Sequence, residues 1–250
     1  RAGVNVITVP GTGFYNFPKR LEAQPFSTAD VRQAMKHAIN RQELLDRILG
    51  GFGTLGNDHP VPKFDPYFAH DLPQTEYDPD KAKFHIQKAG DVAIELAISD
   101  AAFPGATDAA VLFKEQAEKA GINIALRRVP EDGYWTNTWL KEPFCGSYWS
   151  GKPTADLILS QIFLSSSAWN ETAWKNESFD QILVVARGEL DVTKRKQMYF
   201  DLQKMLHDDG GAIIPVFNNQ LFASGQNIAG MVLCPVATGK RVSEQLYFTA

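Results

Sequence analysis

The chain has 250 residues, of which 44% are hydrophobic and 22% charged, and its formal net charge is −4. Such a chain has enough apolar residues for one large or two modest cores. The negative charge and the lack of a basic stripe with interleaved aromatics argue against a nucleic-acid partner, and no apolar run reaches the roughly 20 residues of a membrane-spanning helix.

The start of the chain is predicted to form a strand and then two helices. Residues 4–10 alternate and are rich in β-branched side chains, which predicts a strand. Apolar residues at helical spacing predict a helix from Thr28 onward. A second helix is predicted to begin at Asn40 as its N-cap and to stop at Gly50.

A long loop and a β-α-β unit follow. Glycine and proline are dense over residues 51–79, which predicts an ordered loop, and loops of such length are uncommon in a domain unless they have a role. A short helix should start at Asp78. Strands over residues 92–99 and 122–129, with a helix over 107–120 between them, predict a parallel pair with a right-handed crossover.

The second half adds a strand over residues 144–149, helices over 178–190 and 193–208, a buried strand over 212–217, and short broken strands over 221–248. This order of elements predicts an α/β fold with a mixed β-sheet flanked by helices.

The usual enzyme signatures are missing: the sequence contains no GxSxG, phosphate loop, GxGxxG after a strand or HExxH. Asp58, His59, His70 and Asp71 in the long loop could serve a metal-dependent enzyme module, but solvated loop residues are the default, so we expect no metal, cofactor or catalytic residue.

The two cysteines, Cys145 and Cys234, belong to no metal-binding spacing. One disulfide between them is an alternative, and two buried free thiols are the favoured interpretation.

All the tryptophans fall within forty positions of one another. They are Trp135, Trp139, Trp149, Trp169 and Trp174. Indoles suit the walls of a cleft that holds a ligand by stacking and a few polar contacts. A plain core beneath long loops is an equally good interpretation, and a docking patch of a stand-alone interaction domain is a third.

Two polar side chains near these indoles, one carboxyl and one amide, are candidates for ligand contact. Asp156 could hold an ammonium group by a charge-assisted hydrogen bond, or it could cap the helix that starts there. Asn170 directly follows Trp169.

Several motifs in order resemble one known family. They are VRQAMKHAINR at residues 31–41, YDPDKAK at 77–83, FDQIL at 179–183 and IIPVF at 213–217. They are similar to segments of bacterial solute-binding proteins of family 5, the dipeptide-, oligopeptide- and nickel-binding class. The resemblance spans nearly the whole chain.

The resemblance implies a two-lobed, monomeric, non-enzymatic protein with a periplasmic-binding-protein-like fold, which closes over its ligand and delivers it to the permease subunits of an ABC importer. The location it implies is the periplasm, or the cell surface by a lipid anchor. Residues 1–27 would be a hinge-proximal strand and connector, 28–225 the C-terminal ligand-binding lobe, and 226–250 a return segment toward an N-terminal lobe that this chain lacks.

In peptide-binding members an aspartate soon after a Trp-Ser/Thr-Gly segment contacts the ligand's α-amino group. Here Lys152 follows that segment directly and the nearest acid is Asp156, so peptides, opines and sugar-linked conjugates all stay open as ligands. The ligand-binding residues that we predict are Trp149, Asp156, Trp169, Asn170 and Tyr134, with a weaker second group of Asn57, Asp58 and His59.

Overall fold

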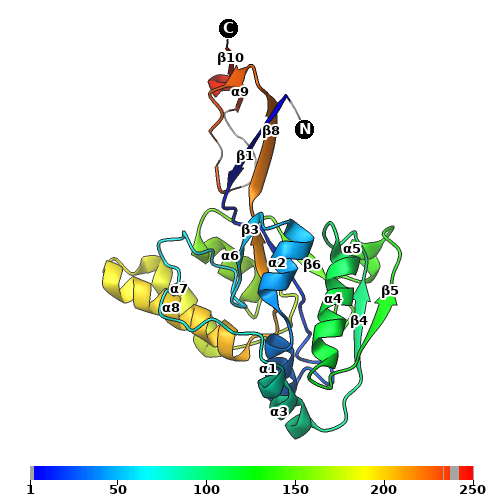
Figure 1. Ribbon diagram of the computed structural model, residues 1–250. Coiled ribbons are helices and arrows are strands. Elements are labelled where there is room, and N and C mark those ends of the chain that lie inside the picture. The colour runs from blue at the N-terminus through cyan, green and yellow to red at the C-terminus, as the bar shows by residue number, and fades with distance from the viewer. Residues whose placement is uncertain (1–2, 233, 237–241, 250) are drawn as a thin grey trace.

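The computed structural model describes residues 3–232, 234–236 and 242–249, and it shows a body of helices and sheets from which a narrow β-ribbon projects (Figure 1). The strands of these residues are β1 (Val4–Val9), β2 (Phe14–Asn16), β3 (Gly53–Leu55), β4 (Ile94–Ile98), β5 (Ile124–Arg128), β6 (Ser147–Trp149), β7 (Val216–Asn218), β8 (Gln220–Gly225), β9 (Ile228–Ala229) and β10 (Tyr247–Phe248). The helices are α1 (Ala29–His37), α2 (Arg41–Leu49), α3 (Pro79–Ala89), α4 (Ala106–Glu118), α5 (Tyr134–Asn137), α6 (Ala155–Phe163), α7 (Glu177–Gly188), α8 (Val192–Asp209) and α9 (Val242–Gln245). Within the described residues, no helix combines the length and the apolar character needed to cross a membrane.

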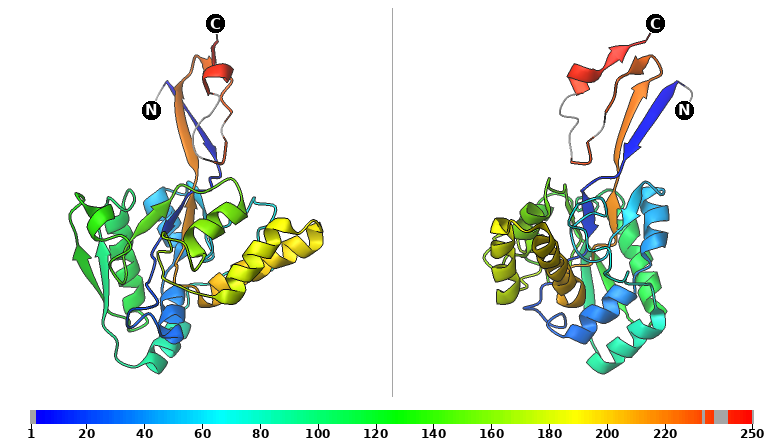
Figure 2. Two further views of the ribbon diagram at one scale, coloured as in Figure 1. Left: turned by 180° about the vertical axis from the view of Figure 1, so that it is seen from behind. Right: turned by 90° about the vertical axis from the view of Figure 1, so that its left-hand side faces the viewer.

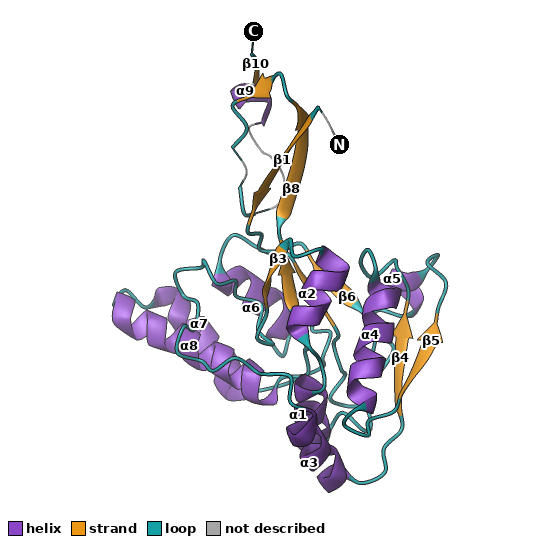
Figure 3. Ribbon diagram, in the orientation of Figure 1, coloured by secondary structure: helices purple, strands orange, loops and turns teal. Residues whose placement is uncertain are grey.

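A four-stranded antiparallel sheet in the order β3-β7-β2-β6 lies at the centre of the body (Figure 3). β7 begins directly after Pro215, so it is shorter than the strand predicted over residues 212–217, since a proline has no N–H to donate to a ladder. The extended segment before it stays attached, because Phe17 N donates to Ile213 O at 2.9 Å.

The predicted β-α-β unit is confirmed. β4 and β5 pair in parallel with α4 between them in sequence, and the isolated parallel bridge between Ala97 and Cys145 links this pair to the segment before β6. Parallel and antiparallel strands therefore occur together with helices on their faces, as predicted for a mixed α/β fold (Figure 2).

The central sheet separates two apolar cores because side chains alternate across a strand. On β2, Phe14 packs with α6, α7 and α8, whereas Tyr15 packs with α1, α2 and α4 on the other face. The two groups of helices lie on opposite sides of the sheet in Figure 1.

The predicted caps at Asn40, Gly50 and Asp78 are present. Asn40 Oδ1 accepts from Glu43 N at 3.0 Å, Gly50 adopts a left-handed conformation with φ 57°, and Asp78 Oδ1 accepts from Lys81 N at 2.9 Å. These local signals depend on short-range hydrogen bonds, which is why sequence alone could place them.

The cationic motif at residues 31–41 stabilises the end of α8. Lys36 Nζ donates to the carbonyl oxygens of Leu206 and His207 at 3.0 and 2.6 Å, and Arg32 pairs with Asp209. Cations at a helix C-terminus satisfy its free carbonyls and oppose its partial negative charge. The same cations also offset the negative charge of Asp209 at this end of α8.

The structure corrects the interpretation of the cysteines. Both thiols are free, and Cys145 is buried, but Cys234 is exposed on the C-terminal segment rather than buried. The residue after Cys234, Pro235, lies near the base of the ribbon, where its carbonyl oxygen accepts from Thr12 N at 3.1 Å, and Cys234 belongs to neither apolar core.

The ribbon pairs β1 with β8 over the register from Val4↔Gly225 to Val9↔Gln220. One face presents Val4, Val6 and Leu221, which are 44%, 63% and 53% exposed. No described part of the body covers these apolar side chains.

Candidate functional site

A pocket of about 360 Å³ opens beside the edge strand β6 of the central sheet, and indoles form most of its wall. Its lining residues are Trp135, Trp139, Tyr148, Trp149, Ser150, Lys152 and Trp169. We call it the indole pocket. Three separate parts of the chain form it: α5 with the turn after it, β6 with the turn after it, and the loop between α6 and α7.

The exposure of the rings shows which of them are at the rim. Trp135, Tyr148 and Trp169 are 39%, 49% and 48% exposed, whereas Trp149 is 7% exposed and forms the floor. Tyr148 contacts Trp135, Trp135 contacts Trp139, and Trp139 contacts Trp169, with ring centroids 5.6 to 6.2 Å apart. Trp139 thus connects the rim rings into a continuous arc of aromatic rings around the pocket.

A buried carboxylate, Glu171, fixes two of these indoles from behind. Glu171 Oε2 accepts from Trp149 Nε1 at 2.9 Å and from Asn16 Nδ2 at 2.8 Å, and Glu171 Oε1 accepts from Trp139 Nε1. Burial raises the pKa of Glu171, and these N–H donors act in the opposite direction. The hydrogen bonds use the indole edges, so that the ring faces are left to line the pocket.

The turn after Trp149 requires glycine. Gly151 has φ 71°, and a Cβ atom there would lie 2.2 Å from the carbonyl oxygen of Thr12. This close approach of two backbones holds Ser150 and Lys152 at the pocket.

A second hollow of about 470 Å³ adjoins the indole pocket and shares Tyr148, Trp149 and Ser150 with it. Its other wall includes Asp100 and Phe103. A ligand longer than the indole pocket could extend into this hollow along β6.

Comparison with known proteins shows the family of the chain. The sequence model of the bacterial extracellular solute-binding proteins, family 5 Middle, matches residues 1–171. The chain belongs to this family.

The chain is similar in sequence to dipeptide-binding proteins and in fold to solved substrate-binding proteins. The chain is 23% identical over 247 residues to the dipeptide-binding protein of Escherichia coli K12, an alignment that covers 93% of this chain and 45% of that protein. DppA from Helicobacter pylori, solved with the peptide STSA, superposes with a TM-score of 0.84 at 20% identity, over 99% of this chain and 49% of DppA. NikZ from Campylobacter jejuni, solved with Ni(L-His), gives 0.80 at 18% identity over 92% and 50%.

The chain spans about half the length of the curated relatives it matches. The predicted membership of solute-binding family 5 and the periplasmic-binding-protein-like fold are confirmed.

Of the residues that we predicted to bind ligand in this family 5 member, Trp149 and Trp169 line the indole pocket. Tyr134 lies beneath it, since its side chain is 1% exposed and its hydroxyl donates to Gly146 O at 2.7 Å. Tyr134 therefore supports β6 rather than facing the pocket.

Asp156 and Asn170 lie elsewhere. Asp156 is in the first turn of α6 and pairs with Arg187 at 2.7 Å, and the N-cap of that helix is Thr154 rather than Asp156. Asn170 is buried and donates to Trp174 O at 2.7 Å, so it shapes the loop that carries Trp169.

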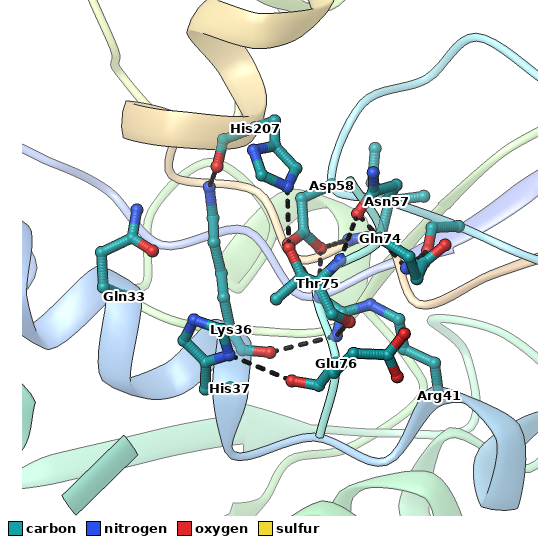
Figure 4. A network of polar contacts seen from close by, with 12 residues as sticks. Gln33, Lys36, His37, Arg41, Asn57, Asp58, Gln74, Thr75, Glu76 and His207 are labelled. Carbon is teal, nitrogen blue, oxygen red and sulfur yellow. Dashed lines mark hydrogen bonds and ion pairs between the residues drawn. The ribbon is translucent and has the colours of Figure 1, made fainter. Parts of the chain in front are cut away.

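The weaker second group, Asn57, Asp58 and His59, lies in the interior, and Figure 4 shows Asn57 and Asp58 inside a polar network. Asp58 forms two hydrogen bonds with Arg41, at 2.9 and 2.7 Å. Asn57 accepts from Thr75 N. The long loop is thus ordered by buried polar contacts, and this group does not line the indole pocket.

The residues proposed for a metal-dependent module do not form a metal cluster. His70 and Asp71 are exposed while Asp58 and His59 are buried, and the described residues contain no group of three or more His, Cys, Asp or Glu side chains that could hold a metal ion. Asp58 is occupied by Arg41.

Glu171 is the main residue that sequence reasoning missed. The available signal was an acid inside an indole-rich segment, because a buried carboxylate needs N–H donors and indoles supply them. The contacts from Trp139 and Trp149 come from other elements, so the pairing itself required the fold.

Proposed function

We propose that this chain is the ligand-binding lobe of a substrate-binding protein that serves an ABC importer, and that the indole pocket captures the solute. The observation that carries the proposal is the open aromatic pocket held rigid by buried Glu171. Rigid aromatic walls bind a small ligand with little loss of conformational freedom. Solute capture in general is supported by the dipeptide-binding protein that is similar in sequence, and by the proteins of similar fold that were solved with a peptide and with Ni(L-His).

We propose that the ligand is a peptide, or a peptide-like or opine-like small polar solute. The protein would pass it to the permease subunits outside the cytoplasm, in the periplasm or at the cell surface where a lipid anchor holds the protein. The protein would act as a monomer and perform no chemistry on its ligand. The second hollow beside the indole pocket offers room for the part of the solute that extends beyond the rings.

Full capture would need a second lobe. An open pocket leaves part of the ligand in water, and the curated relatives are about twice as long as this chain. The exposed apolar face of the ribbon, with Val4, Val6 and Leu221, is a surface that a companion lobe would cover. We propose that this companion lobe closes over the indole pocket.

Tryptophan fluorescence tests the proposal. Titration of the complete protein with di- and tripeptides and opines should change the emission of the pocket indoles, and Trp169→Leu should weaken binding by at least about tenfold. Leu190→Ala is the matched control, since Leu190 is 89% exposed and lies outside the lining of the pocket. Equal affinity of the Trp169→Leu variant and the parent, or hydrolysis of the solute, would contradict the proposal.

A further inference from the structure

The rings of the indole pocket meet at steep angles. The interplanar angles are 72° between Trp135 and Trp139, 72° between Trp135 and Tyr148, and 76° between Trp139 and Trp169, and the smallest, between Trp149 and Trp169, is 43°. A flat ligand ring stacks best in a slot between two parallel faces. Rings set edge to face and tilted leave no parallel slot, and the angular hollow that they line instead suits a compact, rounded group.

The group behind these rings acts as a carboxylate, because each of its two oxygens accepts an indole N–H group. Glu171 accepts the N–H groups of both Trp139 and Trp149, and an anion at the indole edge shifts electron density toward the ring faces. Electron-rich faces attract a cation through the ring quadrupole. Methylated ammonium groups combine a positive charge with a rounded apolar surface, which matches both properties of the pocket.

Lys152 adds a requirement for negative charge on the ligand. It is the one charged residue that lines the pocket, and it forms no ion pair within the described part of the chain. A simple cation would be repelled by its ammonium group. A ligand with a carboxylate beside its cationic head would meet both the rings and Lys152 favourably.

We infer that the indole pocket binds a small zwitterion, with a methylated ammonium head enclosed by the aromatic rings and a carboxylate directed toward Lys152. The inference rests on the proposed function, because it names a ligand class for the same pocket.

Calorimetry on the complete protein with three probes tests this ligand class. The probes are glycine betaine, its uncharged-head isostere 3,3-dimethylbutanoate, and dialanine. Glycine betaine should bind at least about tenfold more tightly than the isostere, which corresponds to about 1.4 kcal/mol. Equal affinity, or a preference for the isostere, would overturn the inference.

Dialanine distinguishes a failure of the zwitterion inference from a failure of the proposed function. If dialanine binds in a manner that Trp169→Leu weakens while glycine betaine does not bind, the zwitterion is wrong and the proposed function stands. If neither these probes nor a mixed peptide library bind, the result counts against both.

Two surface variants test the parts of the inference separately. Lys152→Gln should weaken glycine betaine by about tenfold without weakening tetramethylammonium, whereas Trp169→Leu should weaken both. Lys175→Gln, at an exposed position outside the pocket lining, is the control and should leave both affinities unchanged. Equal loss of the two ligands in Lys152→Gln would overturn the role of the carboxylate.

Discussion

Glu171 accepts the indole N–H of Trp149 at 2.9 Å, and this contact ties the floor of the indole pocket to the loop that carries Trp169. The carboxylate is 4% exposed and also accepts from Asn16 on β2. One side chain therefore joins two strands of the central sheet to the pocket loop. The rigidity of the aromatic wall depends on this buried acceptor.

Glu171→Gln should lower the free energy of unfolding by about 1–3 kcal/mol, because an amide places an NH₂ group against an indole N–H and leaves a buried donor without an acceptor. Urea unfolding followed by tryptophan emission measures the loss. Glu115→Gln, at an exposed position on α4, is the control and should change stability by less than about 0.5 kcal/mol. A variant as stable as the control would mean that the carboxylate does not hold the indoles.

Gly151→Ala should destabilise the protein by about 1–3 kcal/mol and weaken ligand binding. The new Cβ would collide with Thr12 O, and the backbone conformation at φ 71° disfavours alanine. Thermal unfolding and calorimetry measure the two effects. Gly188→Ala, where an added Cβ meets no atom within 4 Å, should be tolerated. Unchanged stability and binding in Gly151→Ala would contradict the close approach.

Arg41→Met should cost about 3–5 kcal/mol, because it leaves the fully buried Asp58 carboxylate without its cation. Arg47→Met on the same helix removes an exposed partner of Glu43 and should cost at most about 1 kcal/mol. Chemical denaturation of both variants gives the comparison. Similar losses for the two arginines would show that the buried network does not order the long loop.

Lowering the pH should destabilise the protein through His59. Burial lowers the pKa of His59 from 6.5 to about 3, and neither ring nitrogen has a hydrogen-bond partner among the described residues. As the pH falls, the His59 ring therefore becomes protonated near pH 6.5 in the unfolded chain, but only near pH 3 in the folded protein. Stability contributed by the neutral ring is present above pH 6.5 and declines as the pH falls through this window.

His59→Phe should remove that part of the pH dependence, because phenylalanine keeps the ring packing against Phe68 without a titrating group. Unfolding free energies between pH 7 and pH 4 for the parent and the variant give the difference. His70→Phe, at an exposed position of the same loop, should keep the parent's decline. An identical pH profile in the parent and His59→Phe would rule out the buried neutral ring as its source.

Sequence alone determined the features that depend on neighbours along the chain. The caps at Asn40 and Asp78, the left-handed turn at Gly50 and the order of β4, α4 and β5 follow from local hydrogen bonds, backbone freedom and apolar periodicity. The family motifs also lie in single segments, which is why the resemblance was visible before the fold.

Tertiary structure decided which side chains face the pocket. Asp156 and Asn170 lie close in sequence to indoles that line the pocket. Asp156 nevertheless pairs with Arg187 on α7, and Asn170 forms its hydrogen bond within its own loop. Burial likewise separates Trp149 and Trp169, which line the pocket, from the enclosed Tyr134. Contacts between elements distant in sequence set these differences, and no local pattern encodes them. The acceptor role of Glu171 arises in the same way, because its donors come from β2, β6 and the turn after α5.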